Sequence, residues 1–438
     1  MVKRSFDLKA TALPSLLTTR QVTARSNAQV GIRPNRERLM HSLAEMAAIG
    51  LQPDGSVCRR GFSTEDVAGR ALLARWMNEA GLQVRIDMAG NLIGRLQGLD
   101  PDRPALMTGS HLDTVPTGGR FDGVLGVLAG LEVCRSLQDN SIRLQHDLEL
   151  IAFADEESTM VGCKGMAGTA SCDPKAYATS NREPIEDNLA RIGGHWPSLA
   201  SARRADDACA AFLELHVEQG GVLEQRGDAI GVVEGVVGQR RFSIQVDGQP
   251  NHAGTTPMTL RQDALVAASR IVLAVEKMAR QHPGDPVATV GRLEVWPNAA
   301  NVVPGSVALT VDLRDVNSVV LDQLVAELMQ QVERIGAETG CPIQLEPQFE
   351  VEPTAAADGV MAAIVSAAED LGLSHSHLPS RASHDAQEIG RRWPMGMIFV
   401  PSRGGLSHSS KEFTSDEHCW AGAAVLLGTL QRLDRELS

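Results

Sequence analysis

The chain has 438 residues, a formal net charge of −13 and seven cysteines. This length exceeds what one compact core usually holds, so we expect two domains. The acidic charge argues against nucleic acid as a partner, since phosphate binding needs a basic face. No apolar run is long enough to span a membrane. The cysteines are scattered, without a Cys-x-x-Cys pair, which is typical of reduced thiols in the cytoplasm.

The N-terminal segment, residues 1–36, differs in composition from the rest of the chain. It is basic and rich in serine and threonine, with Asp7 as the single acid. Such a composition is compatible with an organelle-targeting peptide. We favour the simpler interpretation, a poorly ordered terminal extension or a start codon placed too early, together with a cytoplasmic location.

From residue 38 onward, helices and strands alternate. A helix is expected at 38–50, and another at 63–81 that opens on a capping box of Ser63 and Asp66. A third helix is expected at 122–137. Strands are expected within 82–90, 91–98, 104–111, 147–155 and 210–221. This alternation predicts an α/β domain with a mostly parallel sheet covered by helices on both faces, which binds ligands at the carboxyl ends of its strands.

Near residue 238 the pattern changes to a β-α-β-β-α-β order, which is that of a ferredoxin-like domain. Its expected elements are strand 240–249, helix 260–281, strands 287–296 and 305–315, helix 319–339 and strand 342–352. The α/β pattern then returns with a helix at 358–372, a strand at 395–402 and a closing helix at 416–433. We therefore predict a ferredoxin-like domain, 238–351, inserted into an α/β domain formed by 37–237 and 352–438.

Each predicted strand of the larger domain leads to a side chain that can bind a metal ion. Imidazoles and carboxylates arriving from different strands suit Zn²⁺, Mn²⁺, Co²⁺ or Ni²⁺ better than Ca²⁺ or Mg²⁺. The candidate ligands are His111, Asp122, one of the pair Glu156 and Glu157, His216 and His408. Each has a simpler explanation by itself, as a surface pair, an acidic turn or a core histidine. Their coincidence at the strand ends of one sheet favours a metal site.

Five ligands are too many for one tetrahedral catalytic zinc ion. They fit two metal ions about 3.5–4 Å apart that share a carboxylate, and Asp122, in a glycine-rich turn, is the natural bridge. Asp113 lies two residues after His111, and we expect its carboxylate to accept the second imidazole N–H. Glu156 and Glu157 are adjacent at a strand end and point in different directions, so we expect one of them to bind metal and the other to serve as general base and later to protonate the leaving nitrogen.

Six segments resemble the M20 family of two-metal amidohydrolases and peptidases, over about residue 38 to the C-terminus. They are GSHLDTVPTGGRFDG, DEES, LELHVEQG, GQPNHAGTTPM, PNAANVVPG and GLSHSSKE, in the family's order and spacing. The closest resemblance is to the branch of N-carbamoyl-L-amino acid hydrolases, β-ureidopropionases and allantoate amidohydrolases. His216 stands where the peptidase branches usually carry an acid. DEES replaces the branch's usual NEEG and keeps both glutamates.

The resemblance implies a division of the ligands between two metal ions. His111, Asp122 and His216 would hold one ion, and Asp122, Glu157 and His408 the other. Glu156 would then be the general base.

The resemblance also implies roles for the inserted domain. Arg314 and Asn301 would bind the α-carboxylate of an amino-acid-like substrate, for which a guanidinium fork is suited. His252 would stabilise the oxyanion, and Gln219 would lie near the substrate. The family forms a homodimer through this domain, and its histidine and asparagine reach the neighbouring subunit's site on closure. His384 is an expected pocket residue.

We therefore predict metal-dependent hydrolysis of the carbamoyl C–N bond of an N-carbamoyl-L-amino acid, which gives the L-amino acid, carbon dioxide and ammonia. Allantoate amidohydrolase and β-ureidopropionase activities stay open as alternatives. An aminoacylase or peptidase is disfavoured by His216. A non-catalytic ligand-binding protein is disfavoured by the intact Glu156 and the full ligand set.

Overall fold

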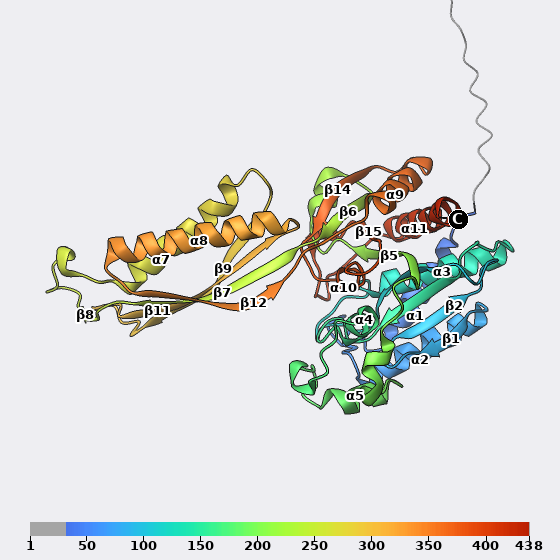
Figure 1. Ribbon diagram of the computed structural model, residues 1–438, viewed down its shortest axis with the longest axis horizontal. Coiled ribbons are helices and arrows are strands. Elements are labelled where there is room, and N and C mark those ends of the chain that lie inside the picture. The colour runs from blue at the N-terminus through green and yellow to red at the C-terminus, as the bar shows by residue number, and fades with distance from the viewer. Residues whose placement is uncertain (1–31, 438) are drawn as a thin grey trace, which may run out of the picture. The chain divides into compact units, whose positions relative to one another are not determined.

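The computed structural model describes residues 32–437 (Figure 1). Most of the predicted N-terminal extension, 1–36, falls outside these residues, so its nature stays a prediction. Within 32–437, every helix is too short or too polar to cross a lipid bilayer. The described chain forms two large sheets, one of nine strands and one of four, each with its own helices.

The nine-stranded sheet has the order β1-β2-β4-β3-β5-β15-β6-β13, with β14 also paired to β6. β3, β4, β5 and β15 are parallel neighbours at its centre, while β1, β2 and β13 pair antiparallel. The strands are β1 (Gln83–Ile86), β2 (Leu92–Leu96), β3 (Ala105–His111), β4 (Leu148–Phe153), β5 (Cys209–Val217), β6 (Ile230–Val236), β13 (Thr354–Ala355), β14 (His375–Ser380) and β15 (Met395–Val400). The predicted α/β fold is confirmed, with a mixed sheet whose centre is parallel.

Helices cover both faces of the nine-stranded sheet, which is why its central strands are buried along their whole length. Met107, Phe212 and Met397 belong to the core that includes α4 and α10. Side chains of the opposite parity point the other way: that of Leu150 approaches α3 and that of Leu215 approaches α11. The helices are α1 (Arg36–Ala48), α2 (Thr64–Glu79), α3 (Val124–Asp139), α4 (Val161–Ala167), α5 (Ile185–Arg191), α6 (Val222–Arg226), α9 (Asp358–Asp370), α10 (Asp385–Ile389) and α11 (Asp416–Glu436).

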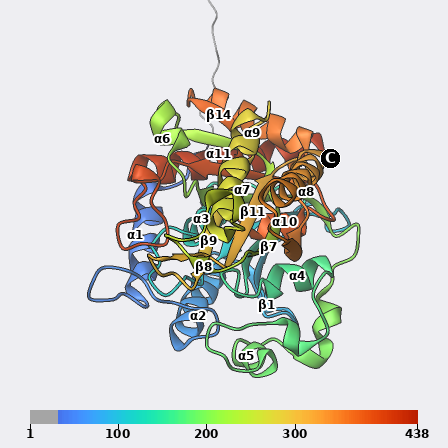
Figure 2. The same ribbon diagram turned by 90° about the vertical axis from the view of Figure 1, so that its left-hand side faces the viewer.

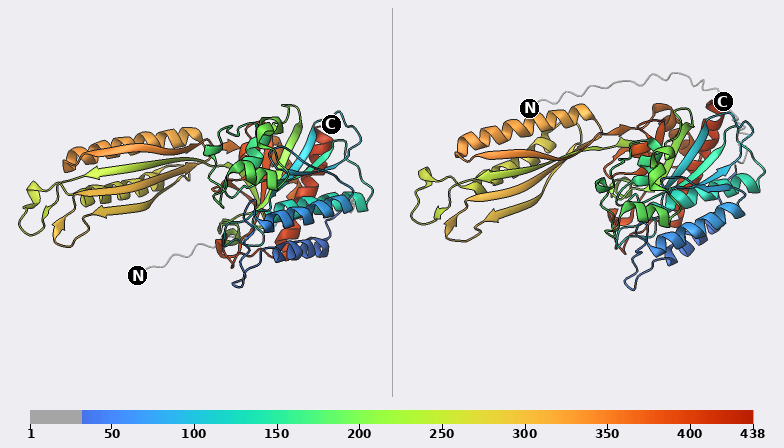
Figure 3. Two further views of the ribbon diagram at one scale, coloured as in Figure 1. Left: turned by 90° about the horizontal axis from the view of Figure 1, so that it is seen from below. Right: turned by 60° about the horizontal axis from the view of Figure 1, so that its bottom comes forward.

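The four-stranded sheet is antiparallel, in the order β12-β7-β11-β9. Alternate residues of β7 and β11 are buried under two helices on one face (Figures 2 and 3). The elements are β7 (Gly238–Asp247), β8 (Asn251–His252), α7 (Ala264–Gln281), β9 (Val287–Trp296), β10 (Val302–Val303), β11 (Ser306–Asp315), α8 (Ser318–Thr339) and β12 (Ile343–Val351). The β-α-β-β-α-β order is as predicted, and the exact limits 238–351 stay a prediction.

Three helix and strand expectations differ from the structure. The helix expected from residue 260 begins at Ala264. Asp263 caps it, because its side chain accepts hydrogen bonds from the backbone N–H groups of Leu265 and Val266. The helix expected from Asp122 begins at Val124, after a sharp turn at Gly123. β6, β13 and β14 were missed, since the short polar segment of β14 becomes a strand only by pairing with β6.

Candidate metal centre

The central strands carry the candidate ligands to one edge of the sheet. His111 is the last residue of β3, and His216 lies near the end of β5. β4 ends at Phe153, directly opposite His111 in the register, and leads into Glu156 and Glu157. Because parallel strands end at the same edge, these side chains converge, as in other α/β sheets.

Two groups of side chains are close enough to hold a metal ion each. In the first group, Asp122 Oδ1 lies 3.1 Å from His216 Nε2 and 3.8 Å from His111 Nε2. In the second group, His408 Nε2 lies 3.3 Å from Asp122 Oδ2 and 3.7 Å from Glu157 Oε1. Asp122 therefore offers one oxygen to each group, which is the arrangement of a shared carboxylate.

A third group, Glu214, His216 and His384, also has suitable spacing. Both oxygens of Glu214 already accept hydrogen bonds, from the Ser110 hydroxyl at 2.7 Å and the Ala386 N–H at 2.8 Å. His384 packs edge-on against the His216 ring, 4.5 Å between centroids. We therefore assign this group to the support of His216 rather than to metal binding.

The turn after β3 explains how Asp122 reaches both groups. The Val124 N–H donates to the Asp122 carbonyl at 2.7 Å, and Gly123 has φ 66° and ψ −48°. These values define a γ-turn with positive φ, which is strained for any residue with a Cβ. A Cβ at Gly123 would also overlap the His111 ring. Glycine is required here for both reasons.

At this edge of the sheet, the negative charges of carboxylates exceed the positive charges of nearby side chains. Burial and the charges of Asp385 and Glu157 raise the pKa of Glu156 well above its ordinary value. Burial and the charge of Asp122 raise the pKa of Glu157 to about 8. Such an excess of buried negative charge is what divalent cations neutralise, so the donor set fits metal ions.

Asp122 raises the pKa values of His216 and His408. Burial would lower the pKa of His216, but its hydrogen bond and proximity to Asp122 outweigh burial and raise that pKa to about 9. The hydrogen bond to Asp122 raises the pKa of His408 to about 8. Burial opposes ionisation of Asp122, yet both histidines hold its pKa well below the ordinary range. Metal binding to these histidines therefore competes with their protonation.

The predicted contact of Asp113 is wrong in one respect. His111 Nδ1 lies 2.9 Å from the backbone carbonyl of Asp113, whereas the carboxylate is 3.8 Å away. The carboxylate instead accepts the backbone N–H groups of Glu156 and Glu157, at 3.3 and 3.1 Å. The backbone carbonyl of Asp113, and not its side chain, therefore contacts the ring. Asp113 thus fixes the glutamate doublet as well as the imidazole.

A cavity of about 350 Å³ opens onto the candidate metal centre. It is lined by all five candidate ligands and Glu156, and by three further predicted residues, Gln219, Arg314 and His384. Gln219 donates to Asp122 Oδ2 at 2.8 Å. His252 and Asn301 are not among the lining residues. They lie beside each other on β8 and before β10, where the Ala253 N–H donates to the Asn301 carbonyl at 2.9 Å.

Two buried acids at the centre, Glu412 and Asp385, were not singled out from the sequence. Glu412 binds the turn that carries Asp122. Asp385 is fully buried beside Glu214 and raises the pKa of Glu156. Glu412 ends the segment GLSHSSKE, so its proximity to His408 was the available signal.

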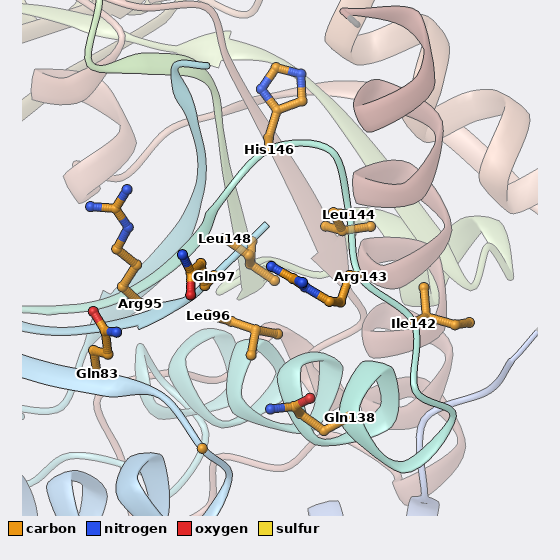
Figure 4. Close-up of a pocket in the computed structure, with 11 residues that line it drawn as sticks. Gln83, Arg95, Leu96, Gln97, Gln138, Ile142, Arg143, Leu144, His146 and Leu148 are labelled. Atoms are coloured by element: carbon orange, nitrogen blue, oxygen red, sulfur yellow. The ribbon is translucent and has the colours of Figure 1, made fainter. Parts of the chain in front are cut away.

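A second cavity, of about 280 Å³, lies between β2 and the segment before β4 (Figure 4). Arg95 and Arg143 line it, but Arg95 is paired with Asp147 and Arg143 donates to the Gly98 carbonyl. Both guanidinium groups are therefore engaged within the protein, and we assign this cavity no function.

Comparison with known proteins decides the family. The sequence profile of Peptidase family M20/M25/M40 matches residues 107–432. The chain belongs to this family. It is therefore a hydrolase, as predicted, and M20 enzymes depend on metal ions, which the two groups sharing Asp122 are able to hold.

Individual M20 relatives are similar over nearly the whole chain. An N-carbamoyl-L-amino acid amidohydrolase of Geobacillus stearothermophilus is 39% identical over 404 residues, 91% of this chain and 98% of that protein. An allantoate amidohydrolase of Bacillus subtilis is 35% identical and covers 89% of this chain and 95% of its own length. The crystal structure of a hydantoinase/carbamoylase family amidase from Burkholderia multivorans has a TM-score of 0.86 at 40% identity, covering 92% of this chain and 98% of its own.

Proposed function

We propose that this M20 enzyme hydrolyses the carbamoyl C–N bond of an N-carbamoyl-L-amino acid, releasing the L-amino acid, carbon dioxide and ammonia. The observation that carries the proposal is the pair of ligand groups that share Asp122, with Glu156, whose side chain is 8% exposed, beside them and outside both. Curated relatives named N-carbamoyl-L-amino acid amidohydrolases, at 33–39% identity, support the substrate class.

Two related activities are alternatives, because relatives with those names are nearly as similar. The Bacillus subtilis relative is named allantoate amidohydrolase, and one from Arabidopsis thaliana, 34% identical, is named ureidoglycolate hydrolase. Their substrates share a ureido group and a carboxylate with N-carbamoyl amino acids. β-Ureidopropionase activity stays a further alternative from the sequence.

Two divalent ions from among Zn²⁺, Mn²⁺, Co²⁺ and Ni²⁺ would polarise the ureido carbonyl and make water more acidic when bound. Glu156 Oε2 lies 3.7 Å from His111 Nε2, so its carboxylate faces the ligand groups. Glu156 takes the proton of the attacking water and returns it to the leaving nitrogen as the C–N bond breaks. The carbamic acid released then falls apart into carbon dioxide and ammonia.

Arg314 is the residue we assign to the substrate carboxylate. Its Nε donates to Asp312 Oδ1 at 2.8 Å and its Nη1 to the Arg381 carbonyl at 2.9 Å. These two bonds fix the plane of the guanidinium at the cavity of the candidate metal centre. A fixed fork of this kind recognises carboxylates.

We assign oxyanion stabilisation to His252, acting in the site of a second subunit. Ser306 pairs with Asp247 at the end of β11 near His252, whereas Arg314 lies eight residues along the same strand. At the usual rise, roughly 26 Å of strand separates the two ends. One small ureido substrate cannot contact both residues of one chain. The His252 Nδ1 accepts the Gly254 N–H at 3.0 Å, which leaves Nε2 to carry the proton it would donate.

A homodimer through the inserted domain would supply that second subunit. β9 is an edge strand of the four-stranded sheet, and its Leu293 and Trp296 are 41% and 62% exposed. Leu293→Lys should yield monomers in light scattering and abolish turnover while the metal content is retained. Full turnover by a monomer would exclude the assignment of His252 to a second subunit.

An ammonia-release panel tests the proposed function. Metal-free protein is loaded separately with each of the four metals and given N-carbamoyl-L-amino acids, allantoate, ureidoglycolate and β-ureidopropionate. We expect the highest kcat/KM for an N-carbamoyl-L-amino acid. A higher value for allantoate or ureidoglycolate would replace the proposal with that activity. Binding of the substrates without ammonia release would indicate a non-catalytic protein.

A further inference from the structure

Glu412 connects the two chain segments that carry Asp122 and His408. Its side chain is buried, with 4% exposure. Oε1 accepts the backbone N–H groups of Phe121 at 2.8 Å and Asp122 at 3.1 Å, and Oε2 accepts the Ser407 hydroxyl at 3.1 Å. The first two contacts hold the turn with the shared carboxylate, and the third holds the residue next to His408.

The Ser407 hydroxyl has two carboxylate acceptors and a single proton. It lies 2.8 Å from Asp122 Oδ2 and 3.1 Å from Glu412 Oε2. A hydroxyl donates to one acceptor at a time. If both carboxylate oxygens of Asp122 bind metal ions, the Ser407 hydroxyl loses Asp122 as its acceptor. It can then donate its hydrogen bond to Glu412 Oε2 instead.

We propose that Glu412 is a positioning residue of the metal centre. It fixes the turn that carries Asp122, and it accepts the hydrogen bond of the Ser407 hydroxyl when Asp122 binds metal. The proposal rests on the proposed two-metal site and concerns metal binding rather than the substrate. Groups that hydrogen-bond to metal ligands tune metal affinity strongly.

The contacts of Glu412 require a glycine at residue 119. A Cβ on Gly119 would overlap the carboxyl group of Glu412. No side chain larger than hydrogen therefore fits at residue 119 while Glu412 reaches the two N–H groups. Gly119→Ala displaces the carboxylate without changing its chemistry, which makes it an independent probe.

The test is Co²⁺ affinity, measured by chelator competition and by the visible spectrum of the bound ion. We expect Glu412→Ala to bind Co²⁺ about 10–100-fold more weakly than wild type. Glu412→Gln should fall between them, because its amide oxygen still accepts both N–H groups but its NH₂ cannot accept the Ser407 proton. Affinity of Glu412→Ala within about twofold of wild type would overturn the proposal, and so would a Gln variant as weak as the Ala variant.

Asp434 provides a matched control. It is buried, on α11, and accepts the N–H groups of two consecutive residues, Gln145 at 3.0 Å and His146 at 2.9 Å. Asp434→Ala should lower the melting temperature but keep wild-type Co²⁺ affinity. An equal loss of affinity in Asp434→Ala would show that any broken carboxylate contact weakens the site, and the role of Glu412 would fail.

Two further variants keep the test decisive. Gly119→Ala should weaken Co²⁺ binding in the wild-type chain and add little in the Glu412→Ala chain. If Glu412→Ala does not fold, Ser407→Ala takes its place, and wild-type affinity there would overturn the proposal. Tight Co²⁺ binding without ammonia release from any substrate would contradict the proposed function and leave the role of Glu412 intact.

Discussion

Replacing Gly123 with alanine tests whether the γ-turn after Asp122 sets the geometry of the metal centre. An added Cβ would lie closer than 3.0 Å to Cε1, Nε2 and Cδ2 of His111, a separation that real Cβ atoms essentially never show. The His111 ring is 2% exposed and bonded to the Asp113 carbonyl, so it has little space to retreat. Either the ring or the turn that carries Asp122 must move.

Two separate losses follow from the Gly123→Ala change. An L-residue at positive φ lowers the free energy of unfolding by about 1 kcal/mol or more. Displacing a ligand should weaken metal binding by at least about 100-fold, the upper end of the effect of groups that merely support ligands. With metal at 100 times the wild-type Kd, this removes most of the about 2.7 kcal/mol that bound metal adds to stability. Chelator competition measures the affinity, and thermal unfolding with and without metal measures the stability.

Gly227 offers the matched control for this change. It also has positive φ, 75°, but a Cβ there would have no neighbour within 4 Å. Gly227→Ala should lose stability through backbone strain alone and bind metal like wild type. If Gly123→Ala binds metal as tightly as Gly227→Ala, the steric argument about His111 is wrong.

Three other changes have defined outcomes. Glu156→Gln should keep its metal content and lower kcat by about 10²–10⁴-fold, since an amide cannot take a proton from water; near-normal ammonia release would refute the base assignment. Arg38→Met should lower the free energy of unfolding in urea by about 3 kcal/mol without affecting metal affinity, because the fully buried Glu132 carboxylate loses its cation. In metal-free protein, the raised pKa values of His408 and His216, about 8 and about 9, add stability that is fully present below pH 6.5 and lost as pH rises through both values. The melting temperature in chelator should fall over that range while metal affinity rises, and a flat profile would contradict the assigned contacts.

The sequence was sufficient to predict the fold class and the set of candidate ligands. Apolar segments of strand length ended at His111 and ran through His216, and parallel strands must end at one edge, so their convergence followed from topology alone. The order of elements likewise indicated a ferredoxin-like insertion. These features depend on periodicity and chain order, which are local properties of the sequence.

The contacts within the site required the tertiary structure. The sequence could place Asp113 near His111, but only the folded backbone decides that the carbonyl, and not the carboxylate, meets the ring. Glu412 binds a turn about 290 residues earlier in the chain, a pairing with no local signature.

By itself, then, the sequence determined which chemical groups gather at the sheet edge, because strand direction and spacing fix where side chains emerge. The tertiary structure decided which of those groups share Asp122, which support it, and that Arg314 lies at the end of β11 opposite to the end near His252. Such choices depend on distances of a few ångströms between distant segments, and packing sets those distances after the local elements have formed.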